Sequence, residues 1–119
     1  MKAILFERLG GIDGMTAIAN GLVDVHVANP RIAPRYAGSD LEKVKHLAAT
    51  FFIQGSGGPN VYQGKDTLSA HRGMNIDSDE FVAVLDDALQ ALDKNGVCQR
   101  EKEEVLAILY GVKGEIVHV

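Results

Sequence analysis

Residues 39–59 read SDLEKVKHLAATFFIQGSGGP, and this stretch decides the class of the fold. Ser39 and Glu42 stand three residues apart, the spacing at which two side chains satisfy free backbone amides at the start of a helix. Apolar residues then recur as they do along one face of an α-helix. They are Leu41, Val44, Ala48, Phe51 and Phe52. Glycines and Pro59 end the pattern, so the stretch predicts a helix that begins at Ser39 and stops at Gly55.

The segment before this helix has a similar periodicity. We expect a short helix over residues 4–9, a break at Gly10-Gly11 and a second helix capped by Asp13. The apolar face of the second helix consists of Met15, Ile18, Ala19, Leu22 and Val25. Pro30 and Pro34 then prevent a long helix from continuing, because proline lacks the amide donor and crowds the preceding turn. A tight corner is predicted there.

The segment after the helix is first irregular and then helical again. Residues 60–75 have weak periodicity, and such a stretch inside a compact domain is often functional. Acidic residues at 77–80 open a helix that ends at Asn95-Gly96, and a last helix follows the solvated charges 101–104. The apolar faces of these two helices are Phe81, Val84, Leu85, Ala88 and Leu92, then Val105, Ile108, Leu109 and Val112. No two-residue alternation persists, so the sequence predicts an all-α fold.

Length and composition restrict the class of protein. The 119 residues fit one domain spanning 1–119, which is large enough to bury a core. A net charge of −4, with 12 basic residues among 16 acidic ones, disfavours a nucleic-acid partner and a membrane surface. Cys98 has no second cysteine with which to form a disulfide, so it indicates a reducing compartment. Because no apolar run follows Met1, we expect the protein in the cytoplasm.

The four histidines are the residues that could carry chemistry, since the chain lacks the common enzyme motifs. His118 is expected in solvent, and His26 is expected to be a partly buried structural residue. His46 lies about 200° around its helix from Val44, so it should point away from the apolar face. His71 alone would be a surface or capping residue. A short helical turn before Gly73 could nevertheless aim its imidazole between the flanking helices.

Several short motifs occur in an order that resembles the group I truncated haemoglobins, including the cyanobacterial ones. They are LFERLGG at 5–11, ANP at 28–30, YAGSDL at 36–41, GGP at 57–59 with Tyr62 and Gly64, and AHRGM at 70–74 with Ile76. The double-glycine breaks and the segment around His71 are specific when they appear in series. The resemblance covers nearly the whole chain.

The resemblance implies a truncated globin, which is a two-over-two helical sandwich around haem b. The iron would be held by His71 as the proximal ligand. The remaining positions that contact haem or its gas ligand in this family correspond here to Tyr36, Val44, Leu47, Ala48, Phe52, Tyr62, Phe81 and Val84. Each of the apolar ones could equally be ordinary core.

The distal side of the pocket departs from the family pattern. Val23 stands where a tyrosine usually donates to the gas ligand, and Val44, Leu47 and Ala48 replace the usual polar residues of the third helix. Tyr36 stands where the family usually has phenylalanine, so it either supplies the distal donor or packs as a phenylalanine would. A one-residue slip of the third helix would bring His46 to the position of a sixth iron ligand.

These observations predict a protein that reversibly binds oxygen or another diatomic gas for storage or transport. The alternatives are a nitric oxide dioxygenase, which would need a reductase, and a gas sensor that uses the same haem. An apolar distal side disfavours the dioxygenase. A helical interaction module without haem is a third possibility. We expect a monomer or a weak dimer.

Overall fold

The structure is a computed structural model that describes residues 4–118, with the backbone alone at residue 67. Its helices, in chain order, are α1 Leu5–Arg8, α2 Gly11–Ala28, η1 Ala33–Tyr36, α3 Leu41–Gly55, α4 Thr67–His71, α5 Ser78–Lys94, α6 Gln99–Gly111 and η2 Lys113–Glu115, where η marks a 3-10 helix. Over the described range there is no strand, and Ile76 and Val117 form an isolated parallel bridge. The all-α prediction is therefore confirmed.

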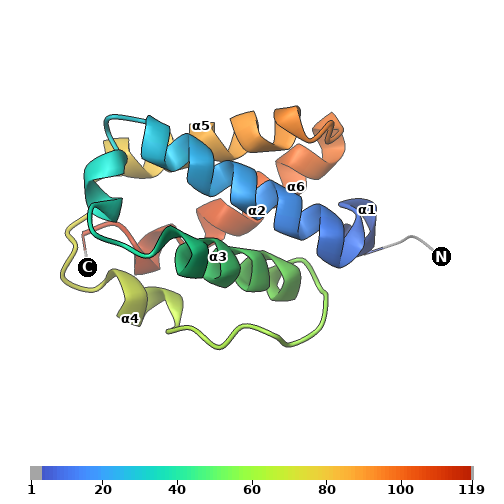
Figure 1. Ribbon diagram of the computed structural model, residues 1–119, viewed down its shortest axis with the longest axis horizontal. Helices are drawn as coiled ribbons and strands as arrows, with labels where there is room; N and C mark the ends of the chain where they lie inside the picture. Colours follow the sequence, from blue (N-terminus) through green and yellow to red (C-terminus); the bar gives the residue numbers. More distant parts are fainter. Residues whose placement is uncertain (1–3, 119) are drawn as a thin grey trace.

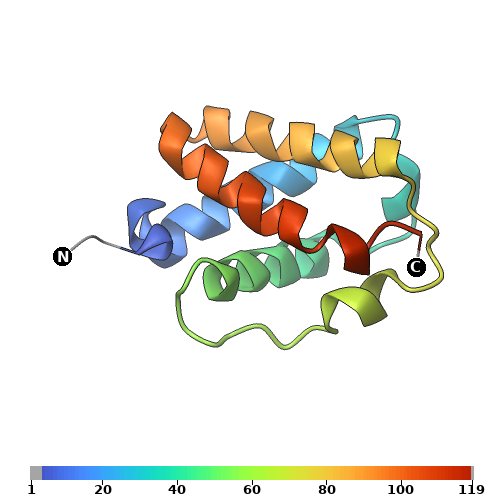
Figure 2. The same ribbon diagram turned by 180° about the vertical axis from the view of Figure 1, so that it is seen from behind.

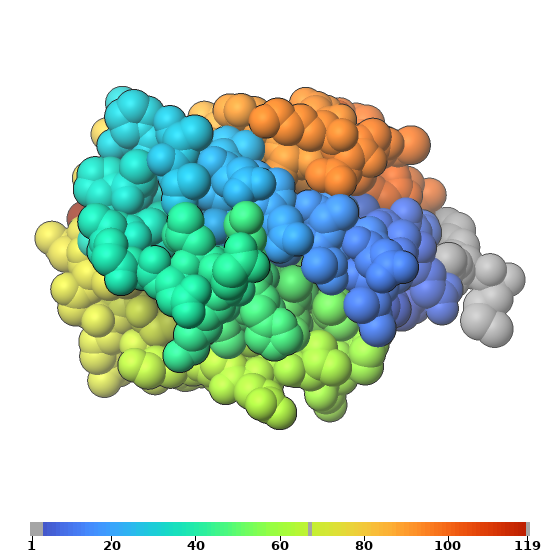
Figure 3. Space-filling model, in the orientation of Figure 1, coloured from blue at the N-terminus to red at the C-terminus, as the bar shows by residue number. Residues whose placement is uncertain are grey.

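The four long helices form two layers. The helices α2 and α3 pack on each other in one layer, and α5 and α6 form the layer behind them (Figure 1). The reverse view places α6 in front of α2 (Figure 2). In the space-filling view, α2, η1, α3 and the segment after α3 form one continuous face (Figure 3). This is the two-over-two sandwich that the sequence predicts.

The helix α2 begins three residues earlier than predicted, with its N-cap at residue 10 and not at residue 13. Its N-cap is Gly10, whose φ of 97° lies in the left-handed region that glycine adopts without strain, and Asp13 lies inside the first turn. The predicted apolar face of α2 is buried as expected. The glycine pair therefore turns the chain and starts the helix at once, which makes a side-chain cap at Asp13 unnecessary.

The helix α3 begins at Leu41, and the prediction that Ser39 caps it is wrong. Asp40 is the N-cap, and its carboxylate accepts a hydrogen bond from the Lys43 amide at 3.3 Å. Leu41, part of the predicted apolar face, is exposed. Ala49, Thr50, Phe52 and Ile53 are the buried residues of α3. Val44, Ala48 and Phe51 of the predicted face are only partly buried, as is Leu47 beside them.

The second layer follows the sequence more closely. Asp77 and Glu80 form a capping box at the start of α5, and Asn95 ends the helix. The acidic residues at the start of α6 are not merely solvated, however. Arg8 donates to both Glu101 and Glu104, which ties α1 to α6. Sequence periodicity could not reveal this contact because its partners lie 93 and 96 residues apart.

The side chains of both layers fill the end of the molecule near α1. The buried cluster there joins α1, α2, α3, α5 and α6 through Leu5, Leu9, Met15, Ile18, Ala19, Leu22, Ala49, Phe52, Ile53, Ala88, Ala91, Leu92 and Val105. Met15, Ala91 and Leu92 are at most 1% exposed. This end of the sandwich therefore has no room for a ligand, and any site must lie towards η1, α4 and η2.

Candidate functional site

The two helical layers enclose two adjoining cavities at the end opposite α1. One has a volume of about 200 Å³ and the other about 460 Å³. Both are lined by Tyr36, His71, Leu109, Val112 and Ile116. The shared walls make them two halves of one hollow between α2, α3, α5 and α6.

Most of the lining is apolar, and it includes the predicted site residues apart from Val23. Tyr36 and His71 line both cavities. The larger cavity is also lined by Val44, Leu47, Ala48, Phe52 and Tyr62. The smaller one is also lined by Phe81 and Val84. The structure thus brings the predicted residues together around one hollow, although their roles toward a ligand remain predictions.

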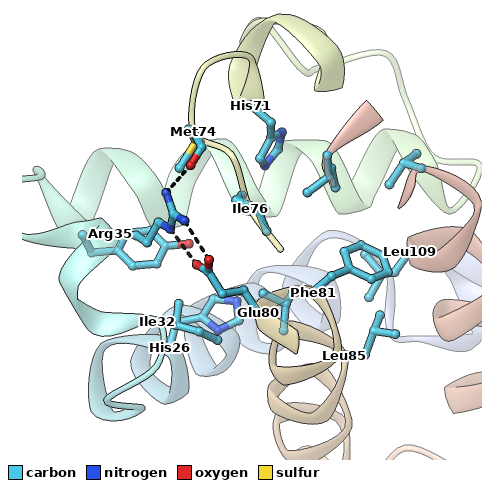
Figure 4. A pocket seen from close by; sticks show the side chains of 14 residues that line it. His26, Ile32, Arg35, His71, Met74, Ile76, Glu80, Phe81, Leu85 and Leu109 are labelled. Atoms are coloured by element: carbon cyan, nitrogen blue, oxygen red, sulfur yellow. Dashed lines mark hydrogen bonds and ion pairs between the residues drawn. The ribbon is translucent and has the colours of Figure 1, made fainter. Parts of the chain in front are cut away.

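His71 reaches the hollow from the end of a short helix. Asp66 caps α4 by accepting from the Ser69 amide at 3.2 Å, which fixes the start of the single turn that carries His71. Gly73 follows with a φ of 85°, so the chain reverses directly after the histidine. The imidazole of His71 points into the hollow (Figure 4). The predicted turn before Gly73 is confirmed.

Tyr36 lines both cavities from the end of η1. Its ring stacks on that of His26, with centroids 6.0 Å apart and planes 13° apart. No described residue forms a hydrogen bond with the Tyr36 hydroxyl. Burial raises the pKa of Tyr36, and the negative charge of Asp87 adds to the effect. The hydroxyl therefore stays protonated and is able to donate.

A buried polar group lies behind Tyr36. His26 Nδ1 is 2.7 Å from Asp87 Oδ2, and Asn29 Nδ2 donates to both carboxylate oxygens at 3.1 and 3.3 Å. Burial lowers the pKa of His26, even though Asp87 acts in the opposite direction. The neutral imidazole then donates its Nδ1 proton to Asp87. The prediction of a buried structural His26 is confirmed, whereas its partner on α5 was not foreseen.

Arg35 closes one side of the smaller cavity. Its Nε and Nη2 donate to the two carboxylate oxygens of Glu80 at 2.7 and 2.8 Å, and its Nη1 donates to the Met74 carbonyl at 2.8 Å (Figure 4). These hydrogen bonds lower the pKa of the Glu80 carboxyl. Sequence reasoning missed this contact, because nothing in the local pattern links residues 45 positions apart.

Tyr62 covers the hollow from the extended segment between α3 and α4. Its ring packs edge to face against Phe51, with centroids 5.7 Å apart. Its hydroxyl donates to the Lys65 carbonyl at 2.5 Å and is thereby occupied. Gly64 lies so close that a Cβ atom there would be 2.4 Å from the Tyr62 hydroxyl oxygen. The tyrosine is thus held by its own loop.

Three further residues lie outside the hollow. His46 is exposed and faces a groove between α2 and α3, on the outer side of α3, as its helical phase predicts. His118 is exposed as well. Val23, expected on the distal wall, is only 2% exposed and is absent from the lining of both cavities. Its short side chain stays within the core, and α2 reaches the hollow through Leu22 and His26 instead.

The lining is suited to a large, flat, apolar cofactor. Across residues 4–118, no group of three or more histidine, cysteine or acidic side chains could hold a bare metal ion. A single imidazole against apolar walls instead fits a metal whose other ligands come from a macrocycle. None of the described helices is long and apolar enough to cross a membrane. The all-helical fold and this hollow together are those of the globin class.

Comparison with known proteins agrees with this class. A family model described as bacterial-like globin matches residues 4–118, so the chain belongs to that family. The group 1 truncated haemoglobin of Tetrahymena thermophila is 30% identical, over 78% of this chain and 77% of that protein. The one from Tetrahymena pyriformis is 27% identical, over 88% and 87%. The crystal structure of the latter in its Fe(III) form superposes with a TM-score of 0.94 at 24% identity, covering 98% of this chain and 100% of that one.

Proposed function

We propose that this truncated haemoglobin binds haem b through His71 and reversibly binds oxygen or another diatomic gas, for storage or transport. The observation that carries the proposal is the position of His71, whose imidazole enters an apolar hollow between the two helical layers. Haem iron would supply the bond to the gas. The residues of the chain hold the cofactor, keep water away and supply a hydrogen-bond donor.

The apolar walls favour haem by removing its ring from water. Val44, Leu47 and Ala48 on α3 line the larger cavity, and Phe81 and Val84 on α5 line the smaller one. Burial of apolar area is worth about 25 cal/mol per Å², so a macrocycle in this space gains a large favourable free energy. Phe52 and Tyr62 extend the same surface.

Tyr36 is the side chain we assign as donor to the gas ligand. Among the described residues, Tyr36 and Tyr62 are the tyrosines that line the hollow. The Tyr62 hydroxyl already donates to Lys65, whereas that of Tyr36 has no such partner. A donor of this kind stabilises a ligand that gains negative charge on binding. Oxygen gains such charge and carbon monoxide gains far less.

Absorption spectroscopy tests the proposal directly. The purified chain is incubated with haem, reduced, and measured without gas and then with oxygen and carbon monoxide. We expect a Soret band that shifts with each gas and returns when the gas is removed. A chain that acquires no Soret band would instead support the helical interaction module.

A further inference from the structure

We propose that Arg35 and Glu80 form a clamp that fixes the distal corner at Tyr36 relative to the loop that carries His71, and that this clamp slows the loss of haem. The inference rests on the proposed function, which supplies the haem. Both residues are positioning residues, since neither is placed as a ligand to iron or gas.

The clamp joins three separate parts of the wall. Arg35 belongs to η1, Met74 to the loop between α4 and α5, and Glu80 to the first turn of α5. The guanidinium uses Nε, Nη1 and Nη2 for these contacts at 2.7 to 2.8 Å. Such a planar fork defines both the distance and the angle between the groups it joins.

Each end of the clamp is attached to a residue of the proposed site. Arg35 immediately precedes Tyr36 in η1. Met74 donates its amide to the His71 carbonyl at 3.1 Å, so holding Met74 restrains the turn after the histidine. Glu80 is fixed in turn by its capping box with Asp77. A shift of the clamp would therefore move the two sides of the hollow relative to each other.

A second ion pair at the other end of the molecule provides a matched comparison. Arg8 binds Glu104 with two guanidinium nitrogens and Glu101 with one, and so joins α1 to α6 next to the filled core. The side chains of Arg8 and Arg35 are 25% and 29% exposed, which makes the two pairs similar in solvation. Only the pair of Arg35 spans the hollow. Loss of either pair should therefore affect folding alike and haem retention differently.

If Arg35 bound haem directly, the Glu80→Gln variant would retain haem more strongly and not more weakly. Arg35 lines the smaller cavity, so its guanidinium could bind a haem carboxylate instead of Glu80. Glu80 would then compete with haem, and Glu80→Gln would strengthen binding. In the clamp, Arg35 and Glu80 act together, so loss of either one weakens haem retention, and loss of Arg35 weakens it more because the bond to the Met74 carbonyl is lost as well.

The test measures transfer of haem from the loaded protein to an excess of a haem-free acceptor globin. We expect Arg35→Met and Glu80→Gln each to lose haem about five- to tenfold faster, because a charged pair that is partly shielded from water is broken. Arg35→Lys keeps the positive charge but not the planar group with several donors. Its rate of haem loss should lie between those of the parent chain and Arg35→Met. Arg35→Glu combined with Glu80→Arg should recover only part of the loss, because the swapped charges attract each other again but a carboxylate at position 35 cannot donate to the Met74 carbonyl. Arg8→Met should change haem loss less than about twofold.

Hydrogen exchange of residues 72–77 in the haem-free chain gives a second readout. Arg35→Met and Glu80→Gln should speed exchange there, while Arg8→Met leaves it unchanged. Circular dichroism of each variant verifies that the helices are retained. Slower haem loss from Glu80→Gln, unchanged haem loss from both clamp variants, or unchanged exchange at 72–77 would each overturn the proposal. If the parent chain binds no haem, the proposed function fails, and the exchange data still decide whether the clamp restrains the loop.

Discussion

The two ends of the helical sandwich are built from the same helices and differ in what lies between them. Near α1, Met15, Phe52 and Leu92 belong to one buried cluster, and the cavity beside Met15 and Phe52 has a volume of only about 10 Å³. Near η1 and α4, the layers are lined by Val44 and Val84 and leave a hollow. The helices continue through both ends, so the difference comes from side-chain size and from the short elements that cap the hollow end. One end is filled by the chain itself, and the other is left open, at the place where we propose that haem binds.

The contrast between the filled end and the hollow end depends most on His71, because this residue is the proposed ligand of the haem iron. His71→Ala should accelerate haem loss beyond the about 10- to 100-fold that follows loss of an outer partner of a metal ligand. The melting temperature of the loaded protein should fall as well, because a ligand that binds only the folded state stabilises it. Haem transfer to an acceptor and thermal unfolding measure the two effects. A variant with undiminished haem retention would show that the hollow is not completed at His71.

Leucines at the two ends sharpen the contrast in stability. Leu92→Ala should lower the free energy of unfolding by about 2–5 kcal/mol, because the variant leaves a cavity in a filled core. Leu47→Ala, in the wall of the hollow, should cost about 1 kcal/mol or less in the haem-free chain. Urea unfolding of both variants without haem makes the comparison. Equal decreases in the free energy of unfolding would mean that the two ends are packed equally tightly.

The Tyr36→Phe variant tests whether the hollow end stabilises bound oxygen more than bound carbon monoxide. Removal of a hydrogen bond to a partly charged acceptor costs about 1.5–3 kcal/mol, so Tyr36→Phe should release oxygen about ten- to more than a hundredfold faster. Carbon monoxide release should hardly change. Stopped-flow rates for both gases make the measurement. A similar change for both gases would indicate a general distortion of the pocket, and no change would leave the distal side without a protein donor.

His26 makes the stability of the hollow end depend on pH. Burial lowers the pKa of His26 in the folded chain, so below its ordinary value of about 6.5 the unfolded chain takes up a proton that the folded chain does not. The free energy of unfolding should therefore decrease as the pH falls from 6.5 toward the folded pKa, by at most about 1.4 kcal/mol per pH unit. His26→Gln should flatten this part of the profile. His46→Gln, which changes an exposed histidine, should retain it.

His46 should give the smallest effect. Its side chain faces the outer groove between α2 and α3 and not the hollow. His46→Ala should therefore leave the absorption spectrum of the ferrous protein unchanged. Conversion of a six-coordinate to a five-coordinate spectrum would show that α3 can shift by one residue when haem is bound.

The sequence predicts the parts of the structure that depend on local pattern. The positions of α2, α3, α5 and α6 follow from helical periodicity, and the resemblance then brings distant residues into one site. The exact ends of helices were less predictable, because neighbouring residues compete for the capping position. Ser39 and Asp40 are both good caps, and only the path of the chain from η1 selects Asp40.

Contacts between distant charged residues could not be predicted at all. Arg35 and Glu80 have neighbours of both signs, and no periodicity singles out this pair. The same is true of His26 and Asp87, whose separation of 61 residues spans three helices. Their pairing follows from the way α2 lies on α5. Such contacts require the packed structure.

The close approach of Gly64 to Tyr62 has a consequence for how this chain can vary. No side chain fits at residue 64 while the tyrosine keeps its place, because even one added carbon would overlap the hydroxyl. Residues 62 and 64 thus form a single unit of sequence variation. A homologue with a larger residue at 64 must have a smaller or displaced residue at 62, and the cover that residue 62 gives the hollow changes with it.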